Sequence, residues 1–123
     1  ARETGRGTPA SRIVLMGFSQ GCAMALVAGL RHAERLAGIA GLSGYLPLAG
    51  KTAGERSAAN RDVPVFLAHG LNDSVVDIDR GLAARAVLDE LSVSCDWHTY
   101  DMDHELCPDE IADLNRWLLQ VLA

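Results

Sequence analysis

The chain has 123 residues, of which about half are apolar, and its 11 basic and 16 acidic residues give a formal net charge of −5. This length and composition fit one packed domain, exclude a disordered chain and argue against a nucleic-acid partner, because the arginines are scattered along the sequence. The odd number of cysteines argues against a disulfide framework, and no apolar run is long enough for stable membrane insertion, so we expect a cytoplasmic protein.

The first half of the chain predicts two strands, one helix and a long loop. Residues 1–11 form a polar lead-in that is rich in Gly and Arg. Residues 12–18 contain a short apolar run that predicts a buried strand, and residues 20–30 contain mostly apolar helix formers, which predict a largely buried helix. Residues 36–42 predict a second strand, made mainly of small residues. Residues 43–61 have no clear period and predict a loop.

The second half predicts two further strands, residues 63–69 and 94–100, and two further helices, residues 79–91 and 108–122. The last helix has Pro108 in its first turn, where a missing N–H is tolerated. Its apolar stripe is formed by Ile111, Leu114, Leu118 and Val121.

Buried strands that alternate with helices are typical of an α/β fold with a mostly parallel sheet flanked by helices. We therefore expect residues 12–123 to belong to one domain of this class. In open parallel sheets, ligands bind outside the carboxyl ends of the strands, so chemistry is expected in the loops at that edge.

A G-x-S-x-G pentapeptide, Gly17-Phe18-Ser19-Gln20-Gly21, lies between the first predicted strand and the first predicted helix. A serine on a sharp turn at this place projects its hydroxyl above the sheet, and the two glycines remove side chains that would clash where strand and helix pass close together. The Gln20 N–H, at the start of the helix, can donate to an oxyanion. The alternative is a serine that only caps the helix, and the strand and helix context favours a nucleophile.

A nucleophilic serine needs a base, and the base needs an acid that orients it. Asp73 follows the third predicted strand and His104 follows the fourth, in the chain order Ser, Asp, His that accompanies this motif. All three residues are expected at the same edge of the sheet. We therefore predict Ser19 as nucleophile, His104 as base and Asp73 as the orienting acid.

Other residues compete for these roles. Asp77 and Asp79 lie near Asp73 but are better explained as carboxylates at the start of a helix. Cys22 could be a second nucleophile, but a small buried thiol is the simpler interpretation. No cysteine and histidine cluster has metal-ligand spacing and no nucleotide-binding glycine motif occurs, so neither a metal nor a cofactor is predicted. The other histidines are interpreted as structural: His32, His69 and His98.

Four stretches of the chain resemble the bacterial carboxylesterase and acyl-protein thioesterase (phospholipase/carboxylesterase) branch of the α/β-hydrolases: Arg12–Gly21, Gly41–Pro47, His69–Val76 and Tyr100–Ile111. The resemblance implies an α/β-hydrolase fold that is truncated at its N-terminus. It implies the same three catalytic residues, the Gln20 N–H as one oxyanion donor, and no cofactor. The implied substrates are small-molecule or lipid-like acyl esters and thioesters.

The sequence departs from this family near the motif residues. Cys22 stands where the family usually has a second glycine after the serine turn, and Asp103 stands where it usually has a glycine before the histidine. Because Asp101, Asp103 and Glu105 surround His104, we hypothesise that the protonated imidazole is favoured and that activity rises at a higher pH than usual.

Members of the family are roughly twice as long as this chain. Their N-terminal half supplies a second oxyanion donor and covers one edge of the sheet. Two functions therefore remain open: a Ser-His-Asp hydrolase of esters or thioesters, or a non-catalytic hydrolase fragment that needs its missing N-terminal half or self-association to cover the open edge. A related hydrolase of lactones or peptides is a third alternative, because fold and triad do not define the substrate.

Overall fold

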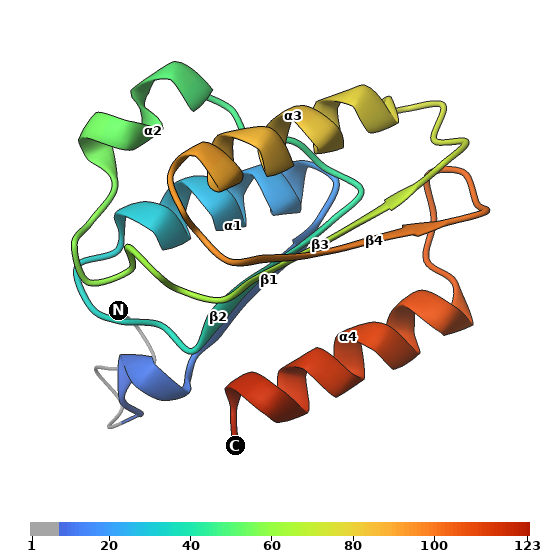
Figure 1. Cartoon of the computed structure of the whole chain (residues 1–123). Coiled ribbons are helices and arrows are strands. Elements are labelled where there is room, and N and C mark those ends of the chain that lie inside the picture. Colours follow the sequence, from blue (N-terminus) through green and yellow to red (C-terminus); the bar gives the residue numbers. More distant parts are fainter. Residues whose placement is uncertain (1–7) are drawn as a thin grey trace.

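A computed structural model of the chain describes residues 8–123 (Figure 1). Its four strands form one sheet in the order β1-β2-β3-β4, and all neighbouring strands are parallel. This confirms the predicted α/β class. Of the polar lead-in, residues 1–7 lie outside the described residues, and Ala10–Arg12 form the short 3-10 helix η2. The strands are β1 (Val14–Phe18), β2 (Gly38–Leu42), β3 (Val65–Gly70) and β4 (Cys95–Tyr100).

Helices lie on both faces of the sheet. In Figure 1, α1, α2 and α3 lie on one side of the strands and α4 lies on the other. The predicted strands and helices are present, with bounds that agree within two residues. None of the described helices is both long and apolar enough to cross a membrane. The helices are α1 (Gln20–Arg31), α2 (Ala49–Glu55), α3 (Ile78–Glu90) and α4 (Pro108–Val121).

The predicted loop between β2 and β3 contains a helix, α2, and this part of the prediction was wrong. The helix begins after Leu48, whose backbone is left-handed with φ 56°, and its buried residue is Thr52. One buried side chain produces no apolar period, and Gly50 and Gly54 lower the helical propensity of the segment. The helix contacts the rest of the protein through Ala49, which packs against the core under α1 and α3, and through Glu55, which accepts a hydrogen bond from Arg31 at 3.0 Å.

The two central strands, β2 and β3, are buried along their whole length. Their side chains alternate between a core under α1 and α3 and a core under α4. The small residues of β2 make room for large neighbours: a Cβ on Gly38 would lie 2.6 Å from Trp117 Cη2, and a Cβ on Gly41 would lie 2.5 Å from Cys22 Sγ. β2 therefore needs small residues on both of its faces, because helices α1 and α4 pack closely against it.

The orientation of α4 differs from the predicted apolar stripe. The residues that face the sheet are Glu110, Leu114 and Trp117, all of them buried, whereas Ile111 is 46% exposed. The Trp117 ring packs against Phe66 of β3, with ring centroids 5.7 Å apart, which holds the helix in this orientation. The prediction was therefore wrong for Ile111 and confirmed for Leu114. The other predicted members of the stripe are half-buried: Leu118 and Val121.

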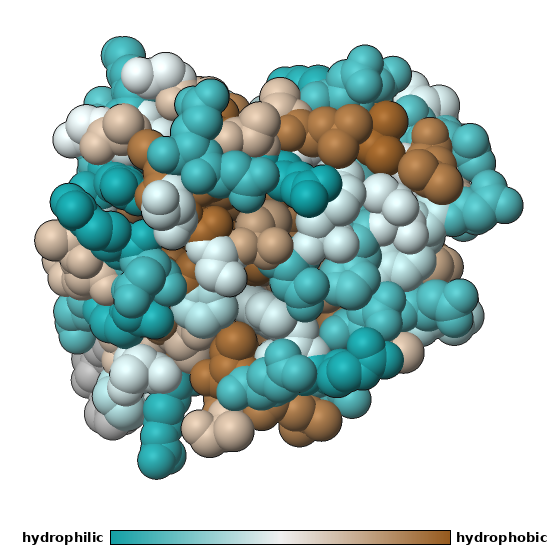
Figure 2. Space-filling model, in the orientation of Figure 1, coloured by the Kyte–Doolittle hydropathy of each residue, from teal (hydrophilic) through white to brown (hydrophobic). Residues whose placement is uncertain are grey.

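Within residues 8–123 both outer strands of the sheet, β1 and β4, lack an outer neighbour, and β1 is the uncovered edge that the resemblance led us to expect. Within residues 8–123, no strand pairs with the outer side of β1, and Met16 and Phe18 on this strand are 51% and 39% exposed. Helix α1 is buried on one side only, because its Met24 is 62% exposed. On the face seen in Figure 2, apolar side chains gather mainly over α3 and, at the lower edge, over α4.

Glu110 is a carboxyl group buried under the first turn of α4. Its exposed fraction is 0%, and neither carboxyl oxygen has a hydrogen-bond partner. Burial raises the pKa of Glu110 to about 7, and the nearby Cys107 N–H lowers it only in part. A group whose pKa is higher in the folded state than in the unfolded chain makes folding less favourable as pH rises between the two values.

We predict that Glu110→Gln stabilises the protein above neutral pH. The pKa of this carboxyl is about 7 in the folded state, against an ordinary value of 4.5, so the free energy of unfolding falls as pH rises through this interval. The amide carries no charge, so the variant should gain roughly 1–3 kcal/mol over the wild type at about pH 8 and much less at about pH 4. Urea unfolding at both pH values measures this difference. Glu90→Gln, which changes an exposed carboxylate, is the control, and an equal gain in that variant would contradict the explanation.

Candidate active site

Three loops at the C-terminal edge of the sheet carry the predicted site residues. Ser19 directly follows β1, Asp73 follows β3 and His104 follows β4. Because all four strands are parallel, these loops lie at the same edge. His104 Nδ1 lies 2.8 Å from Asp73 Oδ2, and the His104 ring centroid lies 4.8 Å from that of Phe18, the residue before Ser19. The structure thus brings the three segments together.

Ser19 has a strained backbone, with φ 60° and ψ −118°. A non-glycine residue in such a conformation costs roughly 1–3 kcal/mol and persists only where the surrounding structure holds it. The Ser19 N–H donates to the Leu42 carbonyl oxygen at 2.7 Å, which ties the turn to the end of β2. Although Ser19 precedes α1, its side chain makes no capping hydrogen bond, so a capping role does not explain this residue.

The turn at Ser19 depends on the absence of a side chain at Gly17. A Cβ there would lie 2.1 Å from the carbonyl carbon and oxygen of Gly21 and 2.7 Å from the Cys22 nitrogen. These are backbone atoms, so the clash could be relieved only by moving the helix. A Cβ on Gly21 would meet no described atom within 4 Å. The expectation that both glycines prevent a side-chain clash was therefore wrong for Gly21, which contributes its backbone to the contact.

Asp73 is held as a buried carboxylate. Its side chain is 0% exposed, and Oδ1 accepts hydrogen bonds from the backbone N–H groups of Val75 at 2.9 Å and Val76 at 2.7 Å. Burial by itself would raise the pKa of Asp73, but the hydrogen bonds from His104 and from the two N–H groups outweigh it and hold the pKa below its usual value. The carboxylate is therefore ionised at neutral pH and can accept a hydrogen bond from an imidazole N–H group.

A second histidine also contacts Asp73. His69 Nε2 lies 2.7 Å from the Val76 carbonyl oxygen and 3.4 Å from Asp73 Oδ2, and the ring is 1% exposed. A buried, hydrogen-bonded ring agrees with the structural role predicted for His69. The contact with the acid itself was not predicted, because a spacing of four residues indicates contact on a helix, and these two residues lie at a strand end and in the loop that follows it.

The competing residues lie elsewhere or serve other purposes. Asp77 caps α3 and accepts a hydrogen bond from the Asp79 N–H, which confirms the interpretation as helix-start carboxylates. His98 faces α4, where Nδ1 lies 3.6 Å from an oxygen of Asp113. His32 directly follows the last residue of α1 and caps the C-terminal end of this helix.

The start of α1 leaves a hydrogen-bond donor beside Ser19. The Gln20 N–H makes no backbone hydrogen bond within residues 8–123, as expected for the first residue of a helix. Cys22, two residues after Gln20, is 2% exposed, and burial raises the pKa of its thiol to about 12. A thiol that stays protonated is a poor nucleophile, so the interpretation of Cys22 as a small buried thiol is confirmed.

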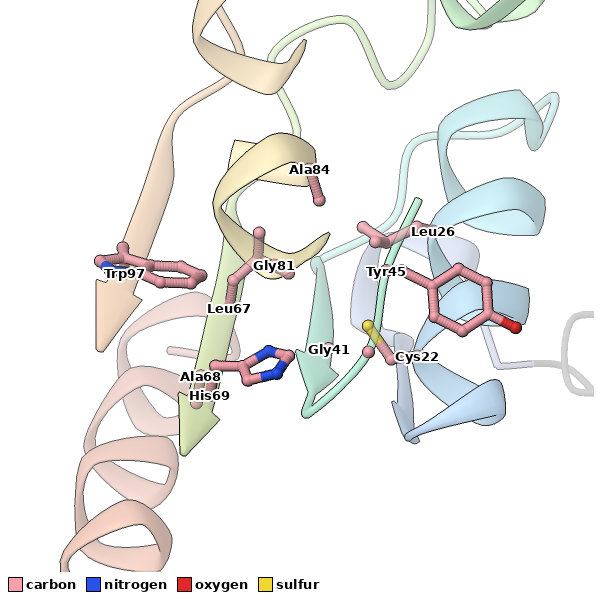
Figure 3. Close-up of a pocket in the computed structure, with 11 residues that line it drawn as sticks. Cys22, Leu26, Gly41, Tyr45, Leu67, Ala68, His69, Gly81, Ala84 and Trp97 are labelled. Carbon is pink, nitrogen blue, oxygen red and sulfur yellow. The ribbon is translucent and has the colours of Figure 1, made fainter. Parts of the chain in front are cut away.

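A small cavity lies between the sheet and helices α1 and α3. Figure 3 shows Cys22 of α1 and His69 of β3 on opposite sides of Gly41 of β2. The volume of the cavity is about 10 Å³, which is enough for about one water molecule. A space of this size is too small for an organic substrate. Within the described residues, no group of three or more His, Cys, Asp or Glu side chains is arranged to hold a metal ion.

The sequence matches a family model described as phospholipase/carboxylesterase over residues 1–122. The chain belongs to the phospholipase/carboxylesterase family. Acyl-protein thioesterase 1 of Yarrowia lipolytica is 43% identical over 119 residues, which cover 94% of this chain and 52% of that protein. Acyl-protein thioesterase 1 of Neurospora crassa is 40% identical over 124 residues, which cover 98% of this chain and 51% of that protein. The chain thus spans about half the length of these relatives.

Solved structures of related proteins have the same fold. Arabidopsis thaliana SOBER1 aligns with a TM-score of 0.94 at 28% identity, covering 99% of this chain and 59% of that one. A phospholipase/carboxylesterase from Dyadobacter fermentans aligns with a TM-score of 0.79 at 28% identity, covering 96% of this chain and 57% of that one. The predicted α/β-hydrolase fold and family are confirmed. The curated relatives named above are eukaryotic, whereas the resemblance suggested bacterial ones.

For this phospholipase/carboxylesterase-family chain, we predict different outcomes for alanine at the two motif glycines. Gly17→Ala forces a Cβ into the backbone of α1 and should lower the free energy of unfolding by at least about 2 kcal/mol. Gly21→Ala meets open space in a helix and should leave stability unchanged or raise it by up to about 1 kcal/mol. Urea unfolding of both variants measures the difference. Equal stability of the two variants would contradict the close approach of β1 and α1.

Proposed function

We propose that this chain carries the reaction centre of a serine hydrolase that cleaves carboxylic esters or acyl thioesters. The observation that carries the proposal is the 2.8 Å contact between His104 Nδ1 and Asp73 Oδ2, made beside the strained turn at Ser19. Membership of the phospholipase/carboxylesterase family supports this reaction class.

In the proposed mechanism, Ser19 Oγ attacks the carbonyl carbon of the substrate while His104 Nε2 accepts the hydroxyl proton. The tetrahedral intermediate collapses, the bond to the leaving group breaks, and His104 gives the proton to the leaving alcohol or thiol. The acyl group then remains on Ser19 as an ester. A water molecule attacks this ester with His104 again as base, and the acid leaves as the proton returns to Ser19. Asp73 accepts the Nδ1–H bond throughout and stabilises the imidazolium.

Within the described residues, the Ser19 hydroxyl and the His104 ring are not hydrogen-bonded to each other. The His104 ring packs against Phe18, the residue that precedes Ser19 at the end of β1. Hydrogen bonds between catalytic groups are often long without substrate and shorten when it binds. A small change in the Ser19 side chain or the imidazole is therefore part of the proposed reaction path.

The negative oxygen of the intermediate needs at least one donor. The free Gln20 N–H at the positive end of α1 supplies it in our proposal. In our proposal a second donor comes from outside the described residues, because the relatives are about twice as long as this chain. Loss of one oxyanion donor lowers turnover by about 10²–10³, which sets the expected deficit of the chain alone.

The proposed substrates are small-molecule or lipid-like acyl esters and thioesters. Two relatives are named acyl-protein thioesterase 1, which supports the thioester part of the proposal. The proposed chemistry uses only the protein's own groups and water. A cytoplasmic location stays a prediction that rests on the cysteine content, and the described cysteines are free thiols: Cys22, Cys95 and Cys107.

The alternative is a non-catalytic fragment. The open outer side of β1, with Met16 and Phe18 exposed, favours this alternative because an unpaired strand promotes association with another strand. In that case a second copy of the chain or a separate N-terminal half would cover the edge, and activity would appear only in the assembled protein.

We predict that a fluorophosphonate probe forms one covalent adduct with the chain, on Ser19. Intact-mass measurement should find this adduct on the wild type and on Ser94→Ala, which changes an exposed serine at the opposite edge of the sheet. Ser19→Ala should form none. A folded wild type without an adduct would favour the non-catalytic alternative.

We also predict faster hydrolysis of an ester or thioester than of the matched amide. The leaving alcohol or thiol needs less help from His104 than an amine does, because an amine must be protonated to leave. Steady-state rates on a p-nitrophenyl ester, a thioester and an anilide with the same short acyl chain measure the ratio. Comparable rates on the anilide would instead support a peptide-type hydrolase.

A further inference from the structure

Two loops meet at the proposed site: the acid loop, residues 71–76, and the histidine loop, residues 101–105. Their main chains are joined where they leave the sheet, since the Leu71 N–H donates to the Tyr100 carbonyl oxygen at 2.8 Å and the Asn72 N–H donates to the Met102 carbonyl oxygen at 3.0 Å. This leaves the tips of both loops to be fixed by side chains.

Close approach of the two loops requires Gly70. A Cβ at this position would lie 2.4 Å from the Met102 carbonyl oxygen and 2.5 Å from the Asp103 carbonyl oxygen. The end of β3 and the histidine loop are therefore in backbone contact. This contact places Asp103 directly above the acid loop.

The Asp103 carboxylate joins the tips of the loops. One oxygen, Oδ1, accepts three hydrogen bonds: from the Ser74 N–H at 2.7 Å, from Ser74 Oγ at 2.8 Å and from the His104 N–H at 2.7 Å. Hydrogen bonds to an ionised carboxylate are shorter and stronger than those between neutral groups. The Glu105 carboxylate in turn accepts the Asp103 N–H at 3.0 Å, so the histidine loop is also braced from within.

The ionised form of Asp103 is the form that these contacts favour. The Ser74 N–H, the Ser74 hydroxyl and the His104 N–H together hold the pKa of the exposed Asp103 carboxyl below its usual value. The hydrogen bonds are therefore present across the pH range in which a histidine base works, and they weaken only in acid.

We propose that Asp103 is a positioning residue, whose carboxylate clamps the main chain of His104 to the acid loop and so sets the imidazole at hydrogen-bond distance from Asp73. The proposal rests on the proposed function for its catalytic meaning. The geometry favours it over the charge effect expected from the sequence, because the Asp103 oxygen is bonded to the His104 main chain and not to its ring. The ring nitrogen Nδ1 is bonded to Asp73.

Removal of the clamp should misplace the imidazole without unfolding the protein. Asp103 is exposed and lies outside both cores, so its effect on overall stability should be small. A displacement of about 1 Å in a reacting group is enough to lower a rate by about 10². The charged groups that flank His104 are Asp73 from the acid loop and, from its own loop, Asp101, Asp103 and Glu105.

Three variants separate positioning from charge. Asp103→Asn keeps an oxygen in the place of Oδ1 and removes the charge, whereas Asp103→Ala removes both. Asp109→Ala is the matched control, because Asp109 is an exposed carboxylate in the first turn of α4 that makes no side-chain hydrogen bond within residues 8–123. Thermal unfolding of each variant establishes that it is folded.

Two measurements are made on the full chain and on each variant. Amide hydrogen exchange, followed by NMR, reports the Ser74 and His104 N–H groups that donate to Asp103. The rate of fluorophosphonate labelling at Ser19, measured across pH, reports the reactivity of the site. The first measurement needs no catalysis, so it separates failure of the clamp from failure of the proposed function.

We expect at least about tenfold faster exchange at both N–H groups in Asp103→Ala and at least about tenfold slower labelling at every pH. Asp103→Asn should restore both quantities to within about threefold of the wild type, and Asp109→Ala should match the wild type. Unchanged exchange in Asp103→Ala would overturn the proposal. So would a normal maximum labelling rate in that variant with only its pH midpoint displaced, since this is the result of a charge effect. If the wild type is not labelled, the proposed function fails for this chain, and exchange alone decides whether the clamp exists.

Discussion

The geometry at Ser19 depends on a contact between two stretches of backbone. The carbonyl group of Gly21 fills the space that a side chain on Gly17 would need, so β1 and α1 cross with nothing between them. The chain reverses direction at Ser19, whose φ is 60°, and the Ser19 N–H donates a hydrogen bond to the Leu42 carbonyl oxygen. Because the strand and the helix are both anchored in the core, the turn cannot relax. The serine is therefore oriented by the sheet and not by a partner of its own side chain.

The loops opposite Ser19 are held by two aspartates in contrasting environments. Asp73 is buried, and backbone amides of its own loop hold it, so its position follows from the local fold of a few residues. Asp103 is exposed, and its partner Ser74 lies on the other loop. A buried carboxylate with three donors is costly to move, whereas an exposed one is restrained only by its hydrogen bonds. In our proposals Asp73 accepts the hydrogen bond from the His104 ring, and Asp103 holds the His104 main chain so that the ring lies at hydrogen-bond distance from Asp73.

Features that depend on short stretches of sequence could be predicted, and features that depend on contacts between distant segments could not. The apolar strands, the motif around Ser19 and the order of the three site residues are local, and the parallel sheet then places those residues at one edge. Glu110 looks like an exposed carboxylate that favours a helix start. It is buried because Trp117, two turns later, holds that side of α4 against the sheet. The contact between Asp103 and Ser74 joins residues 29 positions apart and has no sequence pattern.

The strand that leads into the proposed nucleophile is also one of the two edge strands of the described sheet. A strand that pairs in parallel with the outer side of β1 would lie beside the turn at Ser19, and a loop that continues from its carboxyl end would reach the same edge of the sheet. Assembly of the sheet and completion of the oxyanion site would then be one event. The two free energies would be linked: a ligand that mimics the intermediate should tighten the pairing at β1 by the same factor by which pairing tightens the ligand.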